Sequence, residues 1–150
     1  MKKAMQVAEI ELVYRTNGYP IKQPVVNSSK KAYKILCQHW DRNKIELVEQ
    51  FKVMLLSRSL KVLGILNLSS GGITGSIADP RLIFAAALKA GACNIILAHN
   101  HPSGSFQPSE TDIELSCEIK AIGSLLKIKL LDHLLVTREG YCSLADKGYI

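Results

Sequence analysis

Apolar residues recur along the chain with the two periods that distinguish strands from helices. The runs 48–57 and 61–70 are short, apolar and joined through three residues, which favours a β-hairpin. The stretch NIILA, residues 94–98, is an apolar run of the kind expected for a strand covered on both faces. Residues 129–136 and 141–145 are typical of two further strands. Together these segments predict a β-sheet with at least one buried strand.

Helical spacing of apolar residues separates these strand patterns. Residues 29–40 show it, after a group of Asn and Ser residues that can cap a helix. Asp79 and Pro80 mark the start of a second helix, and Gly91 marks its end. A third helix begins at Ser109 and continues with leucine and isoleucine at spacings of three and four. Because helices and strands are mixed in this way, the sequence predicts an α/β domain in which helices shield the sheet.

The remaining segments are less regular. Residues 5–14 partly alternate and predict a strand, whereas residues 16–26 carry Gly and Pro and predict a loop or an edge segment. The glycine-rich stretch 69–76 predicts a turn with a strand fragment, because it has neither the P-loop ending nor the dinucleotide-binding spacing. No linker or repeat divides the sequence, so we expect one domain in which residues 1–26 belong together with residues 27–150.

Charge is distributed unevenly along the chain. Of its 150 residues 47% are hydrophobic, which is enough for a packed core and too many for a disordered chain. The net charge of +6 comes entirely from residues 1–60, which hold 11 basic and 5 acidic side chains, while residues 61–150 hold 8 of each. A basic surface allows nucleic-acid binding, but a solvated helix face carrying Lys30, Lys31 and Lys34 is the more common explanation.

The sequence shows neither a membrane segment nor a signal peptide. No apolar run approaches the roughly 18 residues of a membrane span, and Glu9 and Glu11 interrupt the stretch after the basic start. The four cysteines are widely spaced and form no C-x-x-C pair, which indicates free thiols. We therefore expect a soluble, cytoplasmic domain.

The segment from His99 to Asp112 carries the candidate chemistry. His99 and His101 are two residues apart where the chain leaves the buried strand, so their side chains project on one face of an extended backbone. Asp112 lies in the first turn of the next helix, and the glycine and prolines between can fold the chain back towards the histidines. Two imidazoles and one carboxylate form the open three-ligand set of catalytic zinc, which leaves a fourth position for water.

A water molecule activated by a metal also needs a group that takes its proton. The H-E-x-x-H signature, which would supply this group beside the ligands, is absent. Glu49 stands at the start of an apolar strand, where a carboxylate can face inward. We therefore select Glu49 as the candidate general base.

The spacing His-x-His, seven residues, Ser, two residues, Asp resembles the metal motif of the JAB/MPN (JAMM) metalloproteases. The longer pattern HNHPSG…PS..D resembles that motif in RadC-type proteins, a bacterial branch of the superfamily. The resemblance extends from about residue 27 to the end, through LLDHLLV and SLADKGYI. It implies a curved mixed β-sheet flanked by helices, with a cytidine-deaminase-like architecture. It also implies hydrolysis of a peptide or isopeptide bond in a protein substrate, with one zinc ion per chain.

The same resemblance implies roles for individual residues. His99, His101 and Asp112 match the zinc ligands. Ser109 matches the serine that helps to hold the tetrahedral intermediate, and Glu49 matches the upstream glutamate that acts as general base. Ser109 and Asp112 also fit a helix capping box, and one pair of side chains can do both.

Two residues and three functions remain open alternatives. Asp132 and His133, in LLDHLLV, are candidates to support the ligands from behind, although a satisfied core histidine is an equal alternative. The domain could instead be a DNA-binding or DNA-processing accessory, which the net charge and the DNA-repair label of the family suggest. It could be a metal-bearing interaction module without catalysis. The same activated water could also cleave a phosphodiester, and the sequence does not indicate the oligomeric state.

Overall fold

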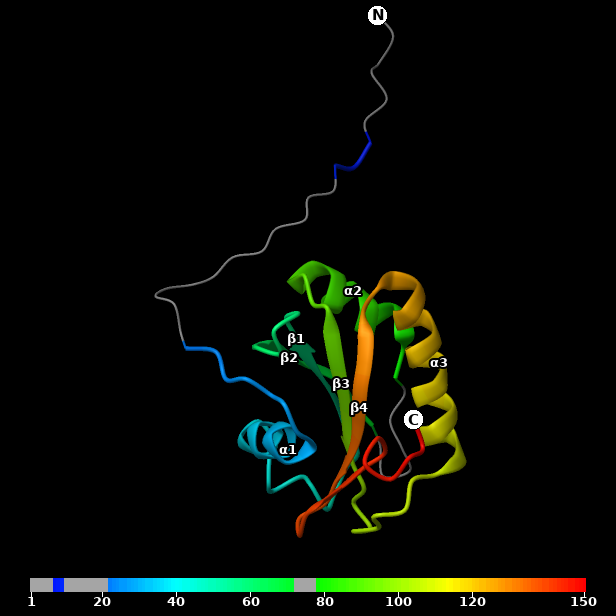
Figure 1. Cartoon of the computed structure of the whole chain (residues 1–150). Helices are drawn as coiled ribbons and strands as arrows, with labels where there is room; N and C mark the ends of the chain where they lie inside the picture. Colours follow the sequence, from blue (N-terminus) through cyan, green and yellow to red (C-terminus); the bar gives the residue numbers. More distant parts are fainter. Residues whose placement is uncertain (1–6, 10–21, 72–77) are drawn as a thin grey trace, which may run out of the picture.

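A central five-stranded sheet lies between helices in the computed structural model, which describes residues 7–9, 22–71 and 78–150 (Figure 1). The elements in chain order are α1 (Ser29–Gln38), β1 (Gln50–Leu56), β2 (Val62–Ser70), α2 (Pro80–Ala90), β3 (Asn94–Asn100), α3 (Glu110–Leu126), β4 (Lys129–Val136) and β5 (Tyr141–Ser143). The strands are ordered β2-β1-β3-β4-β5 across the sheet.

The sheet is mixed, as the sequence predicted. β1 pairs antiparallel with β2 and with β3, and β4 pairs antiparallel with β5. β3 and β4 run parallel, because α3 carries the chain back along the sheet between them. The β1–β2 hairpin is confirmed, and the whole is an α+β arrangement of helices around one sheet.

Two hydrophobic cores cover the two faces of the sheet. Phe51, Val53 and Leu55 of β1 belong to the core with α2 and α3, and the alternate residues Met54 and Leu56 belong to the core with α1. Figure 1 shows α1 on one side of the sheet and α2 and α3 on the other. The central strands are buried on both faces, which is why β1 and β3 appear in the sequence as apolar runs without alternation.

The helix boundaries follow the capping residues. Ser28 Oγ accepts a hydrogen bond from the Lys31 N–H at the start of α1 (3.3 Å), and Asp79 Oδ1 accepts one from the Arg81 N–H at the start of α2 (2.9 Å). Gly91 ends α2 with a φ of 66°, in the left-handed region that favours glycine. The predicted start and end of α2 are confirmed, whereas α1 ends two residues before the predicted boundary, at Gln38.

β3 is longer than predicted, and the difference affects the site. It continues through Asn100, because β1 on one side pairs with it as far as His99 and β4 on the other as far as Asn100. His99 therefore belongs to the strand and not to the following loop. Most of the predicted strand 5–14 and most of the predicted turn 69–76 lie outside the described residues.

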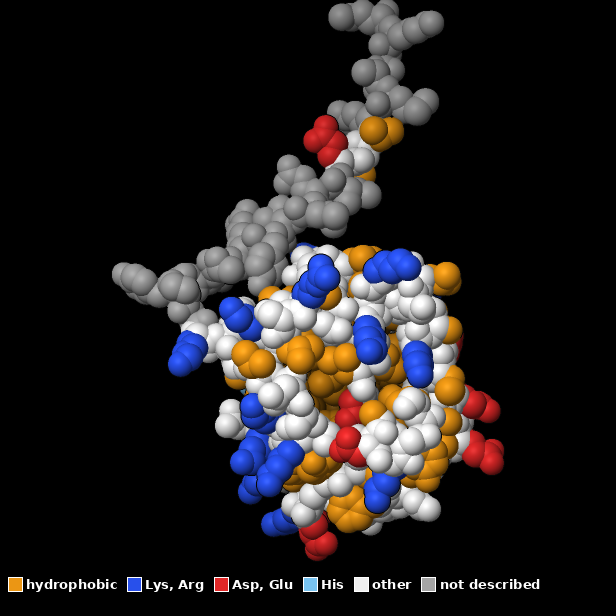
Figure 2. Space-filling model, in the orientation of Figure 1, with side chains coloured by type: hydrophobic (Ala, Val, Ile, Leu, Met, Phe, Trp, Pro, Cys, Tyr) orange, Lys and Arg blue, Asp and Glu red, His pale blue; other side chains and the backbone are white. Residues whose placement is uncertain are grey.

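Lysine and arginine side chains gather over α1 in the space-filling view (Figure 2). Lys30, Lys31 and Lys34 of this helix are exposed, as expected for a solvated helix face. Across the described ranges, the structure has no helix of the length and apolar character needed to cross a membrane.

Candidate metal centre

Three side chains that could hold a metal ion meet at the end of β3. Nε2 of His99 lies 3.0 Å from Nε2 of His101 and 3.1 Å from Oδ1 of Asp112. Nε2 of His101 lies 3.4 Å from Oδ2 of Asp112. One ligand atom from each residue lies within 4.8 Å of the others. The structure therefore brings the predicted His-His-Asp group together.

The three residues come from different elements of the fold and differ in exposure. His99 is the penultimate residue of β3, held between β1 and β4, and its ring stacks on Phe51 with centroids 5.7 Å apart. His101 directly follows the strand, and Asp112 lies in the first turn of α3. His99 is only 1% exposed, whereas His101 and Asp112 keep 16% and 15% exposure, so the group is reachable from solvent on their side.

Asp112 serves the helix and the candidate centre at once. Its Oδ2 accepts a hydrogen bond from the Ser109 N–H (2.8 Å), and Ser109 Oγ accepts one from the Asp112 N–H (3.1 Å), which completes a capping box. The carboxylate still faces both imidazoles. The capping interaction thus fixes the side chain of Asp112 in the position where it meets the two histidines.

A bulge in β4 decides which of two neighbouring side chains faces the ligands. The pairing of β3 with β4 shifts between Ile95 and Ile96 and leaves Leu131 as an extra residue. An extra residue reverses the alternation of side chains beyond it. As a result His133 points to the ligand face of the sheet, and Asp132 points to the opposite face.

His133 and Ser116 determine which nitrogen of His99 carries a proton. The Ser116 hydroxyl donates to the backbone oxygen of Asp112 (2.7 Å), so Ser116 Oγ accepts from Nδ1–H of His133 (2.7 Å). Burial lowers the pKa of His133 well below its usual value, which keeps the ring neutral. Nε2 of His133 is therefore an acceptor and receives the Nδ1–H of His99 (2.7 Å). This leaves Nε2 of His99 with a lone pair that points at the other two ligands.

The loop after His101 orients its ring as His133 orients that of His99, through a hydrogen bond at Nδ1. Nδ1 of His101 lies 3.1 Å from the carbonyl oxygen of Ser105, which can only accept, so Nδ1 carries the hydrogen. When the ring is neutral, it presents its Nε2 lone pair towards Asp112, and when it is protonated, Nε2 donates to the Asp112 carboxylate. Burial alone would raise the pKa of Asp112, but its contacts with the His101 and His99 rings and the hydrogen bond from the Ser109 N–H outweigh burial and lower the pKa far below its usual range. Asp112 is therefore an anion at neutral pH.

The donor set fits a metal ion. Two imidazole lone pairs and a carboxylate face one another, and acceptors at such distances repel unless a proton or a cation lies between them. Zn–N distances of about 2.0–2.1 Å in a tetrahedron place ligand atoms about 3.3 Å apart. The Nε2 atoms of His99 and His101 lie 3.0 Å apart, close to that value, and they approach different oxygens of Asp112, at 3.1 and 3.4 Å. The group could thus hold one metal ion.

Glu49 lies beside this group, on the chain just before β1. The register pairs Phe51 with His99, and Glu49 precedes Phe51 by two residues just as His101 follows His99 by two. The pKa of His101 is raised by its hydrogen bond with Asp112 and, to a smaller extent, by the negative charge of Glu49. The candidate base and the candidate ligands thus lie in one region, and the role of Glu49 stays a prediction.

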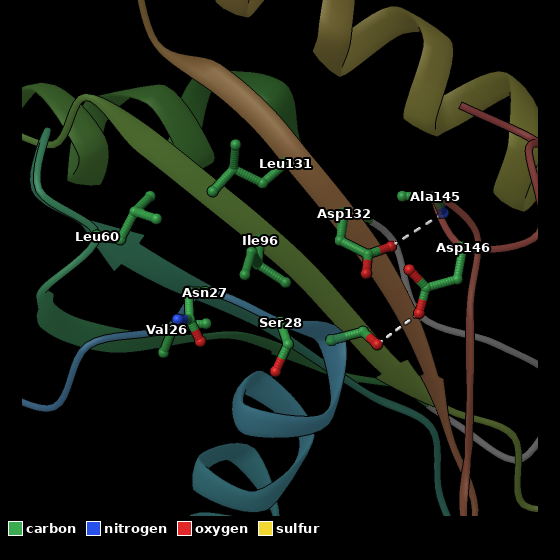
Figure 3. Close-up of a pocket in the computed structure, with 10 residues that line it drawn as sticks. Val26, Asn27, Ser28, Leu60, Ile96, Leu131, Asp132, Ala145 and Asp146 are labelled. Carbon is green, nitrogen blue, oxygen red and sulfur yellow. Dashed lines mark hydrogen bonds between the residues drawn. The ribbon is translucent and has the colours of Figure 1, made fainter.

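Asp132 is not brought into this group. Its Oδ1 accepts from the backbone N–H groups of His133 (2.7 Å) and Ala145 (3.1 Å), and its Oδ2 accepts from the Ser143 hydroxyl (2.6 Å). It lines a cavity of about 260 Å³ between the start of α1 and the strands β3 and β4, where Figure 3 shows it with Asp146. Its oxygens therefore hold the turn after β5, on the face of the sheet opposite the ligands.

Two residues of this region escaped the sequence-based reasoning. Ser116 is four residues beyond Asp112, so helical periodicity places both on one face of α3, and this spacing was the available signal. Asn100, between the two histidines, makes three hydrogen bonds to the segment that carries Glu49. No local pattern marks Asn100, because its partners are about fifty residues away in the sequence.

Known proteins resemble the chain over nearly its whole length. The family model of the RadC-like JAB domain matches residues 26–149. A UPF0758 protein of Flavobacterium johnsoniae is 40% identical over 149 residues, which cover 95% of this chain and 61% of the relative. One of Syntrophotalea carbinolica is 32% identical over 149 residues, covering 99% of this chain and 65% of the relative. One of Porphyromonas gingivalis is 45% identical over 103 residues, covering 68% and 45%. The chain thus spans less than two thirds of the length of these relatives.

The fold and the ligand group define an α+β domain that presents a His-His-Asp group at the end of a buried strand. The chain belongs to the RadC-like JAB domain family. The resemblance inferred from HNHPSG…PS..D is confirmed, and the five-stranded mixed sheet flanked by helices agrees with the JAB/MPN fold.

Proposed function

We propose that this domain is a zinc-dependent hydrolase that cleaves a peptide or isopeptide bond in a protein substrate. The observation that carries the proposal is the orientation of the ligands. Hydrogen bonds hold the Nδ1 atoms of His99 and His101 on the side away from Asp112, so both Nε2 atoms face Asp112 at a position reachable from solvent. A histidine pair that only packed in the core would not need this arrangement.

In this proposal the metal, Glu49 and Ser109 each have a separate role in the hydrolysis. Zinc, when bound, supplies Lewis acidity, which makes a water molecule acidic near neutral pH and polarises a carbonyl. Glu49 takes the proton of the attacking water and delivers it to the leaving amine. Ser109 lies at the exposed start of α3, where its hydroxyl can donate to the developing oxyanion.

Metal analysis of the purified protein tests the ligand set. We expect about one zinc per chain in the wild type and loss of the metal in His101→Ala, because two ligands hold zinc far more weakly than three. Metal retained at full occupancy in His101→Ala would contradict the ligand assignment.

An activity screen with zinc-loaded protein tests the reaction. Peptide, isopeptide and nucleic-acid substrates are compared, and we expect turnover of an amide substrate. Glu49→Gln should lower the rate by about 10²–10⁴ while zinc stays bound, because a general base contributes about that much. Glu46→Gln is the matched control, since Glu46 is exposed and pairs with Arg138 at the surface. Turnover of nucleic acid alone, or a rate unchanged in Glu49→Gln, would contradict the proposal.

A further inference from the structure

Asn100 lies between the two histidines, and its side chain faces the other side of the sheet. It is fully buried, and the hydrogen bonds of its amide are all made to one segment. Oδ1 accepts from the Gln50 N–H (2.7 Å), and Nδ2 donates to the carbonyl oxygens of Ile45 (2.7 Å) and Val48 (2.9 Å). Both donors of the amide and its acceptor oxygen are therefore satisfied.

The bonded segment leads from α1 into the sheet. Residues 41–49 contain neither helix nor strand, and their local backbone hydrogen bonds are turn bonds such as Leu47 N–H to Lys44 O. The two carbonyls that Asn100 binds point into the protein, where an unpaired carbonyl is costly. One side chain from β3 thus replaces the backbone pairing that this segment lacks.

The segment ends at Glu49. Val48 and Gln50, the neighbours of Glu49 on both sides, are both bonded to Asn100. The carbonyl of Glu49 itself accepts from the Gly71 N–H (2.8 Å). The backbone of Glu49 is therefore fixed from both sides to the strand that carries the candidate ligands.

We infer that Asn100 is a positioning residue, which holds the carboxylate of Glu49 at the distance from His99 and His101 that proton transfer requires. The inference rests on the proposed function, because Asn100 would position Glu49, the general base of that reaction. The inference goes beyond the proposed function, because it ties the candidate base to the consecutive residues His99, Asn100 and His101 at the end of β3 and directly after it. A movement of Glu49 by about 1 Å would by itself cost a large part of the rate.

Two substitutions at Asn100 test this inference with the zinc-loaded protein. Asn100→Ala removes all three bonds, and Asn100→Asp keeps the acceptor for Gln50 but removes both donors. We expect kcat to fall at least about tenfold in each, with KM and zinc affinity changed less than about threefold, because the ligands themselves are untouched. Asn43→Ala, an exposed residue of the same segment, is the matched control and should behave as the wild type.

A double-mutant cycle separates positioning from a general loss of stability. If Asn100 acts through Glu49, adding Asn100→Ala to Glu49→Gln should lower kcat no further. Losses that multiply in the double variant, or a kcat of Asn100→Ala near the wild-type value, would overturn the inference. Circular dichroism of each variant verifies that it is folded, and Asn100→Asp replaces Asn100→Ala if the latter does not fold.

A second readout does not depend on activity, so it separates failure of this inference from failure of the proposed function. The side-chain carboxyl carbons of glutamate are labelled with ¹³C, and the Glu49 signal is assigned by its absence in Glu49→Gln. We expect zinc to shift this signal in the wild type and in Asn43→Ala, but to shift it at most half as far in Asn100→Ala and Asn100→Asp. An equal shift in the Asn100 variants, or no shift in the wild type, would overturn the inference even if the enzyme is active.

Discussion

Nδ1 of His99 lies 2.7 Å from Nε2 of His133, and this contact fixes the tautomer of His99. The order of donors runs from His99 through His133 to Ser116 and ends at the backbone oxygen of Asp112. The chain of bonds therefore begins at one candidate ligand and ends on the residue that supplies another. A shift of α3 relative to β4 would disturb both ligands together, so the centre and the packing of this helix are coupled.

Removing the acceptor behind His99 should weaken metal binding. His133→Phe keeps a ring of similar size but leaves Nδ1–H of His99 without a partner, so the tautomer is no longer fixed. We expect zinc affinity to fall by about 10–100-fold, the usual effect of losing such a supporting bond. Competition against a chromophoric chelator measures the change. His133→Gln, whose amide oxygen can still accept, should lose less.

His39→Ala is the control for that series. His39 is exposed at the end of α1, far from the ligands in the fold, and it should leave zinc affinity unchanged. If His133→Phe binds zinc as tightly as His39→Ala, then His133 is a packing residue and the tautomer argument is wrong.

Substitutions of Asp112 and Ser109 should distinguish metal binding from helix capping. In Asp112→Asn the amide oxygen can still accept from the Ser109 N–H, so the cap remains while the anionic ligand is lost. Ser109→Ala keeps the carboxylate but removes the acceptor for the Asp112 N–H. We expect Asp112→Asn to lose most of its zinc affinity, and Ser109→Ala to lose about 1 kcal/mol of unfolding free energy with zinc affinity within a few-fold.

Denaturant unfolding of the metal-free proteins and zinc competition measure the two effects separately. Ser109→Thr, which can still cap, is the control for the stability loss. The division of roles fails if Ser109→Ala loses zinc as completely as Asp112→Asn does.

The ligand group could be predicted from the sequence because its geometry is local. His99 and His101 share a face of an extended backbone, and Asp112 enters through a helix start that Ser109 marks by itself. The helix α2 could be predicted for the same reason, since its capping residues lie next to it in the sequence.

The support of the group could not be predicted, because it depends on pairing between distant segments. Whether Asp132 or His133 faces the ligands is decided by the extra residue Leu131 in β4, and nothing in LLDHLLV marks where a bulge will form. Asn100 likewise acquires its function only when β1 and its preceding segment pack against β3.

The turn between α3 and β4 packs against Gly123 of α3 and should tolerate no side chain there. A Cβ there would overlap the backbone oxygen of Ile128, which cannot move aside as a flexible side chain can. We expect Gly123→Ala to lower the free energy of unfolding by about 1–3 kcal/mol, the usual cost of overpacking. Gly64→Ala is the matched control, because no atom lies within 4 Å of its Cβ position, and urea unfolding compares the two. Equal stability of both variants would show that α3 can shift away from β4.

A proton on His101 should compete with zinc, so zinc affinity should depend on pH at values above the usual pKa of histidine. The pKa of His101 is raised, chiefly by its hydrogen bond with Asp112, so the metal-free centre holds a proton where zinc must bind. The pKa of Asp112 is lowered far below its usual range, so this carboxylate stays ionised and adds no competition near neutrality. We expect zinc affinity to decline as the pH falls through the raised pKa of His101, beginning above the ordinary value of about 6.5. Calorimetry in two buffers of different ionisation enthalpy counts the released proton.

The stability of the metal-free protein should show the opposite trend. A raised pKa in the folded state means that the contribution of His101 is fully present below the pKa of the unfolded chain and is lost as the pH rises through the folded value. Thermal unfolding between about pH 5.5 and 8.5 should therefore show this contribution weakening with rising pH without zinc, while the stabilisation added by zinc grows over the same range. The comparison with His101→Gln isolates the contribution, because glutamine has no proton to lose. If zinc affinity is flat over this range, or if His101→Gln shows the same pH dependence as the wild type, then His101 is not the group that the proton and the metal share.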